Sequence, residues 1–186
     1  NLMIATKIAE EHGGKPIDPK YLKEKVVTFM GIGGSDWATR IQCDFATHAL
    51  TPKWTVIDNH CFPWSLTILM NDDAIAKAHQ MGADLAAAAR KIADGTFVPA
   101  HGCFNEDYKG PAGVCPYCHS NNFYLQEDGV AICCLCGTEG VMKNVDGKYV
   151  FEFDREKWIP HAHDSIPGKF IHGDDIQRNE AEARTL

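Results

Sequence analysis

The sequence predicts an α/β protein in which a parallel sheet is followed by a small four-cysteine metal module. Two apolar runs, 26–32 and 54–58, are separated by one helical pattern, which is the order of a β-strand, α-helix, β-strand unit. Further along, two Cys-x-x-Cys pairs stand fourteen residues apart. This spacing is typical of four thiolates around one ion. We therefore expect two structural units of different kinds.

The run 26–32 reads VVTFMGI and has almost no polar residue. Strands of this kind are buried on both faces and belong to parallel sheets. The run ends at the segment GGSDW (33–37), in which Ser35 or Asp36 can cap a following helix. Apolar residues then recur at helical spacing: Ala38, Ile41, Phe45 and Ala49. The sequence thus predicts a strand, a tight turn and a helix.

The second run, 54–58, reads WTVID and predicts a parallel neighbour reached by a right-handed crossover. An aromatic loop (59–65) follows, and a long helix should run from Asn71 or Asp72 to about Ile92. Its inner face is rich in small residues, so it should lie close on the sheet. A further helix is expected over 2–11.

Two strands cannot complete an α/β core, because a parallel sheet needs more strands to bury both faces. We therefore expect either that an N-terminal half precedes Asn1 or that a partner chain supplies it. The expected organisation is residues 1–95 as the later half of the α/β domain, 96–113 as a linker, 114–159 as the metal module and 160–186 as a C-terminal tail.

The cysteines of the module are Cys115, Cys118, Cys133 and Cys136. Four thiolates make a closed tetrahedral site, so zinc is the expected metal and iron the second choice. Such a site has no open position for substrate and is expected to stabilise the fold. Between the pairs, two short strands should flank a turn at Asp128–Gly129, and Lys148–Phe153 should form another strand. Cys134 is interpreted as a bystander.

Composition excludes several classes of function. The 186 residues carry a net charge of −7, which argues against nucleic acid as the main partner. No apolar run approaches the length of a membrane span. Half of the eight cysteines have metal spacing, so we expect a reducing cytoplasm rather than a disulfide-bonded secreted protein.

The turn at 33–37 is the best candidate for ligand contact, because ligands bind beyond the carboxyl ends of parallel strands. Gly33 and Gly34 allow close approach of the backbone to a ligand; the alternative is that they only form a tight turn. Asn59, His60 and Trp64 should lie at the same edge of the sheet, where Trp64 can cover an aromatic ligand or a partner. The motif is neither G-x-G-x-x-G nor a P-loop.

Other reactive side chains support no site. Cys43 and Cys61 have no evident base beside them, so no nucleophile is proposed. The histidines of the tail follow no metal spacing and are interpreted as surface or interface residues: His161, His163 and His172.

The stretches KVVTFMGIGGSDW and VIDNHCFPWS resemble the later half of the flavodoxin-like NADPH-dependent FMN reductases, a family that includes the iron–sulfur flavoproteins. The tail SIPGKFIHGDDIQ is similar to members that carry a C-terminal zinc-ribbon extension. The resemblance covers about residues 1–95 and implies a five-stranded parallel sheet. The runs 26–32 and 54–58 would be its fourth and fifth strands, and the first three would precede Asn1.

This resemblance implies a flavin-dependent NAD(P)H oxidoreductase in which FMN passes electrons from NAD(P)H to a small-molecule or protein acceptor. Residues of the turn would touch the isoalloxazine edge: Gly33, Gly34, Ser35, Asp36 and Trp37. The family's usual dimer implies a homo-oligomer, a dimer or a tetramer. Two of the family's flavin-binding loops do not occur in these 186 residues, so tight binding of FMN by this chain alone is not expected. Two alternatives stay open: a non-catalytic zinc-ribbon binding module, and a structural subunit completed by a partner chain.

Overall fold

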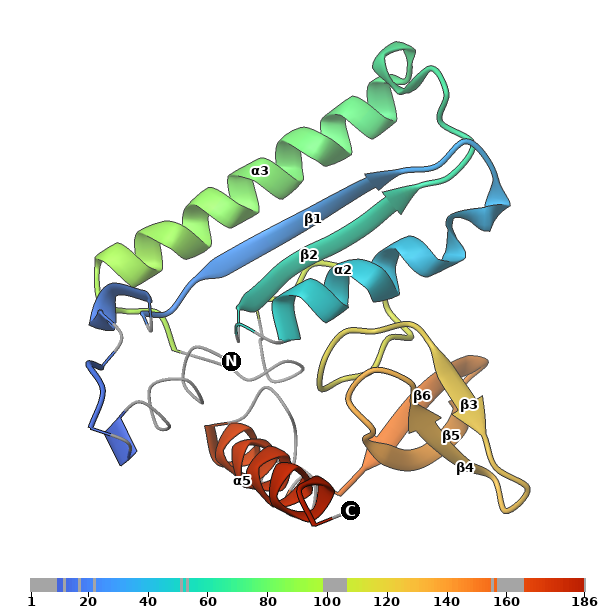
Figure 1. Ribbon diagram of the computed structural model, residues 1–186. Helices are drawn as coiled ribbons and strands as arrows, with labels where there is room; N and C mark the ends of the chain where they lie inside the picture. Colours follow the sequence, from blue (N-terminus) through green and yellow to red (C-terminus); the bar gives the residue numbers. More distant parts are fainter. Residues whose placement is uncertain are drawn as a thin grey trace.

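The computed structural model describes residues 10–11, 13–16, 18–21, 23–50, 52, 54–98, 107–154, 156 and 166–185. Figure 1 shows two units, an α/β unit and a small antiparallel sheet beside it. Nearly all of the helix expected over 2–11, and both His161 and His163, fall outside the described residues. Among the described residues, no helix is both long and apolar enough to cross a membrane.

The α/β unit is built on two parallel strands, β1 (Val26–Ile32) and β2 (Thr55–Phe62), paired from Val26 with Thr55 to Ile32 with Phe62. A 3₁₀ turn, η2 (Asp36–Arg40), leads into helix α2 (Ile41–Leu50), and a second, η3 (Ile68–Met70), precedes α3 (Asp72–Ala93). A first short turn, η1 (Pro19–Tyr21), comes before β1. The two helices cover opposite faces of the strand pair (Figure 1). The predicted strand–helix–strand unit is confirmed.

Gly31 explains how closely α2 lies against β1. A β-carbon at this position would stand 2.4 Å from Ile41 Cγ2 and 3.1 Å from the Phe45 ring. Phe45 in turn stacks on Phe29 of β1, with ring centroids 5.0 Å apart. The glycine therefore makes room for the helix, while the neighbouring aromatic pair fills the interface.

Helix α3 begins as the sequence predicts. Asn71 is its N-cap, and its side chain accepts a hydrogen bond from the amide of Ala74 at 3.0 Å. Asp72 and Asp73 occupy the first turn and Arg90 and Lys91 the last, which suits the helix dipole at both ends.

The expectation that β1 is buried on both faces is wrong. Met30 and Ile32 are 48% and 55% exposed, because they line an apolar hollow of about 600 Å³ between β1 and α3 that no described segment fills. Strand β2, in contrast, is buried from Thr55 to Asn59. The hydrophobic run in β1 therefore marks a surface that stays open among the described residues.

Strand β2 continues four residues past its predicted end at Asp58, so that Asn59, His60 and Cys61 belong to the strand and not to a loop. The polar side chain of Asn59 is tolerated there because its Nδ2 donates to the Gln42 carbonyl of α2 at 2.7 Å. Phe62 closes the strand against Ala74 and Met81 of α3.

Part of the expected linker 96–113 is packed. The amide of Lys109 donates to the Ile57 carbonyl at 2.7 Å, and the Tyr108 ring stacks on His119 at 3.9 Å between centroids. Residues 107–109 thus lie along the outer edge of β2. Coverage of an exposed strand edge limits unwanted pairing with other chains.

The second unit, here called the cysteine module, comprises the loop 114–122 and a four-stranded antiparallel sheet in the order β3-β4-β5-β6. Its strands are β3 (Phe123–Leu125), β4 (Val130–Cys133), β5 (Glu139–Val145) and β6 (Lys148–Phe153). The predicted hairpin is confirmed, with Gly129 at φ 83° and Asp128 Oδ1 accepting from the Val130 amide. Strand β5 was not predicted, because GVMKNV alternates too weakly to reveal a strand.

The expected C-terminal tail contains a helix, α5 (Ile166–Ala183). Pro167 lies in its first turn, where a missing amide donor leaves no helical hydrogen bond unmade. The proline therefore marks the start of the helix.

Candidate metal centre and ligand pocket

The four predicted ligands meet at one point in the cysteine module. Their Sγ atoms all lie within 4.8 Å of one another, with Cys115 to Cys136 at 3.8 Å and Cys118 to Cys133 at 3.5 Å. A tetrahedral ion with metal–sulfur bonds of about 2.3 Å requires sulfurs about 3.8 Å apart. The cluster therefore fits a tetrahedral metal ion.

Local backbone geometry brings the sulfurs together. The amide of Tyr117 donates to Cys115 Sγ at 3.4 Å, and the amide of Gly137 donates to the Cys133 carbonyl at 3.0 Å. Gly137 has φ 72°, the left-handed value expected after the second cysteine pair. Each pair is thus folded into a tight turn with both sulfurs on its inner side.

The chemistry of the cluster favours a cation. Burial, with hydrogen bonds donated by the thiol to Cys115, Cys133 and Cys136, raises the pKa of Cys118. Hydrogen bonds from the other three cysteines lower the pKa of Cys133. Four thiols packed this closely cannot all ionise without a positive charge among them, and a divalent metal supplies that charge. Cys134 is exposed and lies outside the cluster.

The cysteine cluster packs against helix α2. Leu50 packs against the buried core around Cys115 and Cys118, and the Ser120 hydroxyl donates to Cys43 Sγ at 3.3 Å. Asn121 Nδ2 donates to Gln42 Oε1 at 3.1 Å. Residues that directly follow the first cysteine pair therefore dock the module on the α/β unit, and Cys43 takes part in this contact.

The predicted ligand turn at 33–37 is shaped mainly by packing. A β-carbon on Gly33 would lie 2.6 Å from Ala38 Cβ, and the Gly33 amide and carbonyl bond to Phe62 and Ser65. At Gly34 the nearest obstacle, Leu66, is 3.4 Å away. The geometry favours the tight-turn interpretation for Gly33 and leaves Gly34 open to approach. The Trp37 side chain lies outside the described part of the structure.

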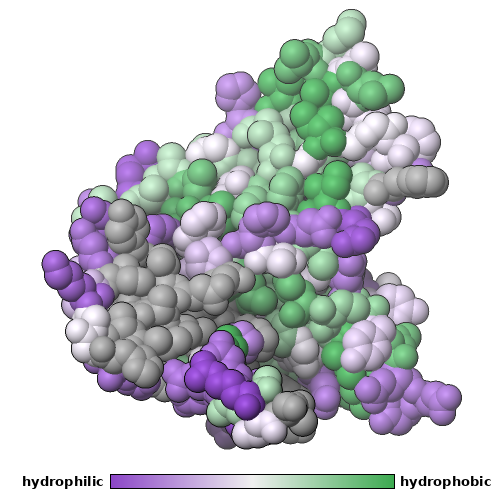
Figure 2. All heavy atoms as spheres, viewed as in Figure 1, coloured by the Kyte–Doolittle hydropathy of each residue, from purple (hydrophilic) through white to green (hydrophobic). Residues whose placement is uncertain are grey.

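A pocket of about 340 Å³ opens beside this turn, where the α/β unit meets the cysteine module. Figure 2 shows the molecular surface hollowed between these two units. The described lining comes from three regions: Asp36, Ala38, Thr39 and Gln42 around α2; Cys61, Pro63 and Trp64 at the end of β2; and Asn121 of the module. Of the five predicted turn residues, Asp36 lines the pocket.

Trp64 stands at the pocket with 69% of its side chain exposed and φ 56°. A left-handed backbone is costly for a bulky residue and is often retained at functional sites. Trp64 and Asp36 line the same pocket, so the predicted placement of Trp64 near the turn is confirmed.

The pocket wall is stabilised by a chain of amides. Gln42 Nε2 donates to the Asn59 carbonyl at 2.7 Å, and Asn59 Nδ2 donates back to the Gln42 carbonyl. Asn59 is 1% exposed, so it supports the wall from behind and does not line it. Sequence reasoning missed Thr39, Gln42 and Asn121. The available signals were a polar helix face next to the turn and an amide three residues after the first cysteine pair.

His60 and Cys61 are neighbours on β2 with different surroundings. His60 faces α3, and burial together with Lys77 lowers its pKa. Cys61 lines the pocket, but burial raises its pKa, so its thiol is protonated at neutral pH and is a poor nucleophile.

The described lining suits a planar ring, either that of a flavin or that of an aromatic acceptor, better than a phosphate group. Its volume lies at the lower end of small-ligand sites and suits one planar ring system. Among the described lining residues there is no lysine or arginine, and the only charged side chain is the acidic Asp36. The described lining therefore offers no cationic side chain to a phosphate.

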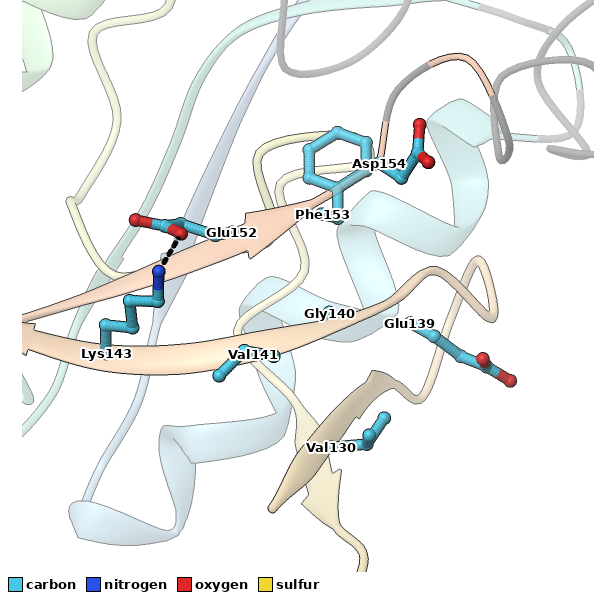
Figure 3. A pocket seen from close by; sticks show the side chains of 8 residues that line it. All are labelled: Val130, Glu139, Gly140, Val141, Lys143, Glu152, Phe153 and Asp154. Atoms are coloured by element: carbon cyan, nitrogen blue, oxygen red, sulfur yellow. Dashed lines mark ion pairs between the residues drawn. The ribbon is translucent and has the colours of Figure 1, made fainter. Parts of the chain in front are cut away.

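A third hollow lies on the sheet of the cysteine module. Figure 3 shows Lys143 and Glu152 paired across β5 and β6, with Glu139 and Asp154 nearby. The volume is about 440 Å³, and the carboxylates outnumber the single lysine. None of the four clustered cysteines is among its described lining residues, and the surface is acidic.

Comparison with known proteins gives two matches. A solved structure of a flavone reductase shares 53% sequence identity with a TM-score of 0.81, covering the whole of this chain and 60% of that chain. The flavone synthase cfoJ of Aspergillus candidus is 25% identical over 164 residues, covering 84% of this chain and 48% of that protein. No family model matches. The chain thus has the fold of part of a flavone reductase, and it spans between about half and three fifths of the length of the proteins it matches.

Proposed function

We propose that this chain belongs to an NAD(P)H-dependent oxidoreductase that uses FMN to reduce a flavone-class acceptor. The observation that carries the proposal is the 53% identity to a flavone reductase across the entire chain. The reaction is a two-electron reduction: NAD(P)H gives a hydride, solvent gives a proton, and the acceptor takes up both. The flavin, when bound, supplies hydride chemistry between the nicotinamide and the acceptor.

Within this proposal, the turn of Gly33, Gly34, Ser35, Asp36 and Trp37 would hold an edge of the flavin ring. The open approach at Gly34 supports this assignment. The pocket between Trp64 and Asn121 would then take the planar acceptor, because its lining is uncharged apart from Asp36. The flavin phosphate would be bound by residues other than the described lining.

The cysteine module would hold zinc at Cys115, Cys118, Cys133 and Cys136, with iron as the second choice. The sulfur spacing supports a tetrahedral ion of either kind. Four thiolates leave the ion no free position, so its role is to shape the module that closes one side of the pocket. A homodimer or tetramer in the cytoplasm completes the proposal.

A second candidate function is that of a subunit whose flavin site is completed by other residues. The exposed apolar hollow at Met30 and Ile32 favours it, since β1 has an open face toward α3. Figure 2 shows hydrophobic side chains gathered on this upper part of the molecule. In this case the chemistry is the same, but this chain alone would not catalyse it.

The test uses the purified chain with added FMN, NADPH or NADH, and flavone under anaerobic conditions. Loss of nicotinamide absorbance that requires both FMN and flavone is the expected result. A protein that binds no FMN and consumes no nicotinamide would rule out the oxidoreductase function for this chain. Metal analysis of the same sample distinguishes zinc from iron.

A further inference from the structure

The ligand pocket has one wall that does not come from the α/β unit. Asn121 is the one cysteine-module residue in the described lining, and it stands opposite the end of β2. We propose that Asn121 is a specificity residue that selects planar aromatic ligands bearing a hydroxyl group. The identity of the ring system as a flavone rests on the proposed function; the requirement for a hydroxyl rests on the pocket itself.

The shape of the pocket favours a flat ligand. Trp64 offers an exposed indole at one side, and the apolar groups of Ala38, Cys61 and Pro63 line the rest. Aromatic faces stack well on planar rings. A pocket of about 340 Å³ has room for one such ring system and little more.

The polar groups determine which flat ligand binds. Asn121 Nδ2 is held by Gln42 Oε1 at 3.1 Å, and by the Thr39 carbonyl at 3.5 Å. Asn121 Oδ1 is buried and has no hydrogen-bond partner among the described residues. Asn121 is itself a lining residue, so a ligand in the pocket lies beside this amide. The oxygen is then an acceptor that a ligand hydroxyl can satisfy.

Gln42 is the positioning residue for this amide. Its Nε2 is already committed to the Asn59 carbonyl at 2.7 Å, so its Oε1 is the atom that faces Asn121. This arrangement fixes the Asn121 nitrogen toward α2 and leaves its oxygen as the free acceptor. Asp36 adds a second acceptor and repels anions, so a neutral phenol is favoured over a carboxylate or phosphate.

A site that hydrogen-bonds a ligand hydroxyl rejects the analogue that lacks it far more strongly than an apolar pocket does. The wild-type chain should therefore bind a hydroxylated flavone at least about tenfold more tightly than unsubstituted flavone. Both affinities are measured by calorimetry without nicotinamide, so that the result does not depend on turnover.

Two variants test the assignment, each after its metal-to-protein ratio has been measured. Asn121→Ala should bring the two affinities to within about twofold, since the acceptor for the ligand hydroxyl is lost. Asn122→Ala is the matched control: it alters the neighbouring asparagine, which does not line the pocket, and should behave as the wild type.

Several outcomes would overturn the proposal. These are equal binding of the two flavones by the wild type, or an undiminished preference in metal-replete Asn121→Ala. Competition between FMN and the flavone would assign the pocket to the flavin ring instead. A chain that shows the Asn121-dependent preference but never oxidises NAD(P)H would refute the proposed function and leave this inference standing.

Discussion

The Ser120 hydroxyl donates a hydrogen bond to Cys43 Sγ at 3.3 Å, which joins the loop after the first cysteine pair to the first turn of α2. Ser120 is fully buried, and its carbonyl also accepts from the Cys115 amide at 2.7 Å. One residue thus touches both the loop of the first cysteine pair and the helix that borders the ligand pocket. Loss of a metal from the four cysteines should therefore also destabilise the packing of α2 in the α/β unit.

Replacing Cys115 with serine should release the metal and lower the melting temperature, because a closed thiolate site contributes directly to folding. Metal analysis and thermal unfolding monitored by circular dichroism check both effects. Cys134→Ser is the matched control, since Cys134 is exposed and outside the cluster. A Cys115→Ser protein with unchanged metal content and melting temperature would contradict a metal site here.

The ion pair of Asp58 and Lys77 makes a second prediction about stability. Asp58 is fully buried on β2, and Lys77 Nζ of α3 lies 2.6 Å from its Oδ2. Lys77→Met leaves the buried carboxylate without a counter-charge and should destabilise the protein by about 3 kcal/mol. Urea unfolding measures the change.

The double variant Asp58→Leu/Lys77→Met is the control for that experiment. An apolar pair of similar size often matches or exceeds a buried ion pair in stability. The double variant should therefore recover most of the loss. If it is as unstable as Lys77→Met, the cost arises from lost packing of the lysine stem and not from the unpaired charge.

Gly31 and Gly82 form a matched pair for testing the packing of the helices. Gly31→Ala places a methyl group 2.4 Å from Ile41 Cγ2 and should cost about 1–3 kcal/mol through overpacking. Gly82→Ala meets no atom within 4 Å on α3 and should stabilise the helix by roughly 0.5–1 kcal/mol. Chemical denaturation measures the free energy of unfolding of both variants. Equal changes would show that α2 can shift away from β1 at little cost.

Local signals predicted much of this fold. The β-branched run of β1, the Asn71 cap of α3 and the Asp128–Gly129 turn each act over a few neighbouring residues, so the sequence reveals them directly. The cluster of four cysteines could also be predicted from the sequence, because their spacing is typical of sulfurs that meet at one point.

Long-range features could not be predicted in the same way. Asn121 forms a hydrogen bond with Gln42, which lies 79 positions earlier in the chain. The sequence around either residue does not indicate this contact. The exposure of Met30 and Ile32 likewise depends on what covers β1, which an apolar run cannot tell. The pocket is formed by segments that lie far apart in the sequence. Of its described lining residues, Asp36 and Trp64 were predicted as ligand contacts.

The last prediction concerns pH. Burial and then the positive charge of Lys77 lower the pKa of His60 in the folded protein, while Asp58 opposes them. The unfolded chain has the ordinary histidine pKa of about 6.5 and therefore takes up a proton first as the pH falls. The contribution of His60 to stability is complete above that value and is lost as the pH falls from it toward the lower pKa of the folded state.

Urea unfolding should show a smaller loss of stability for His60→Gln than for the wild type between about pH 7 and about pH 5. Taking the difference between the two proteins cancels the release of metal by protonated cysteines, which affects both alike. Parallel stability curves for the two proteins would mean that His60 is as easily protonated in the folded state as in the unfolded chain.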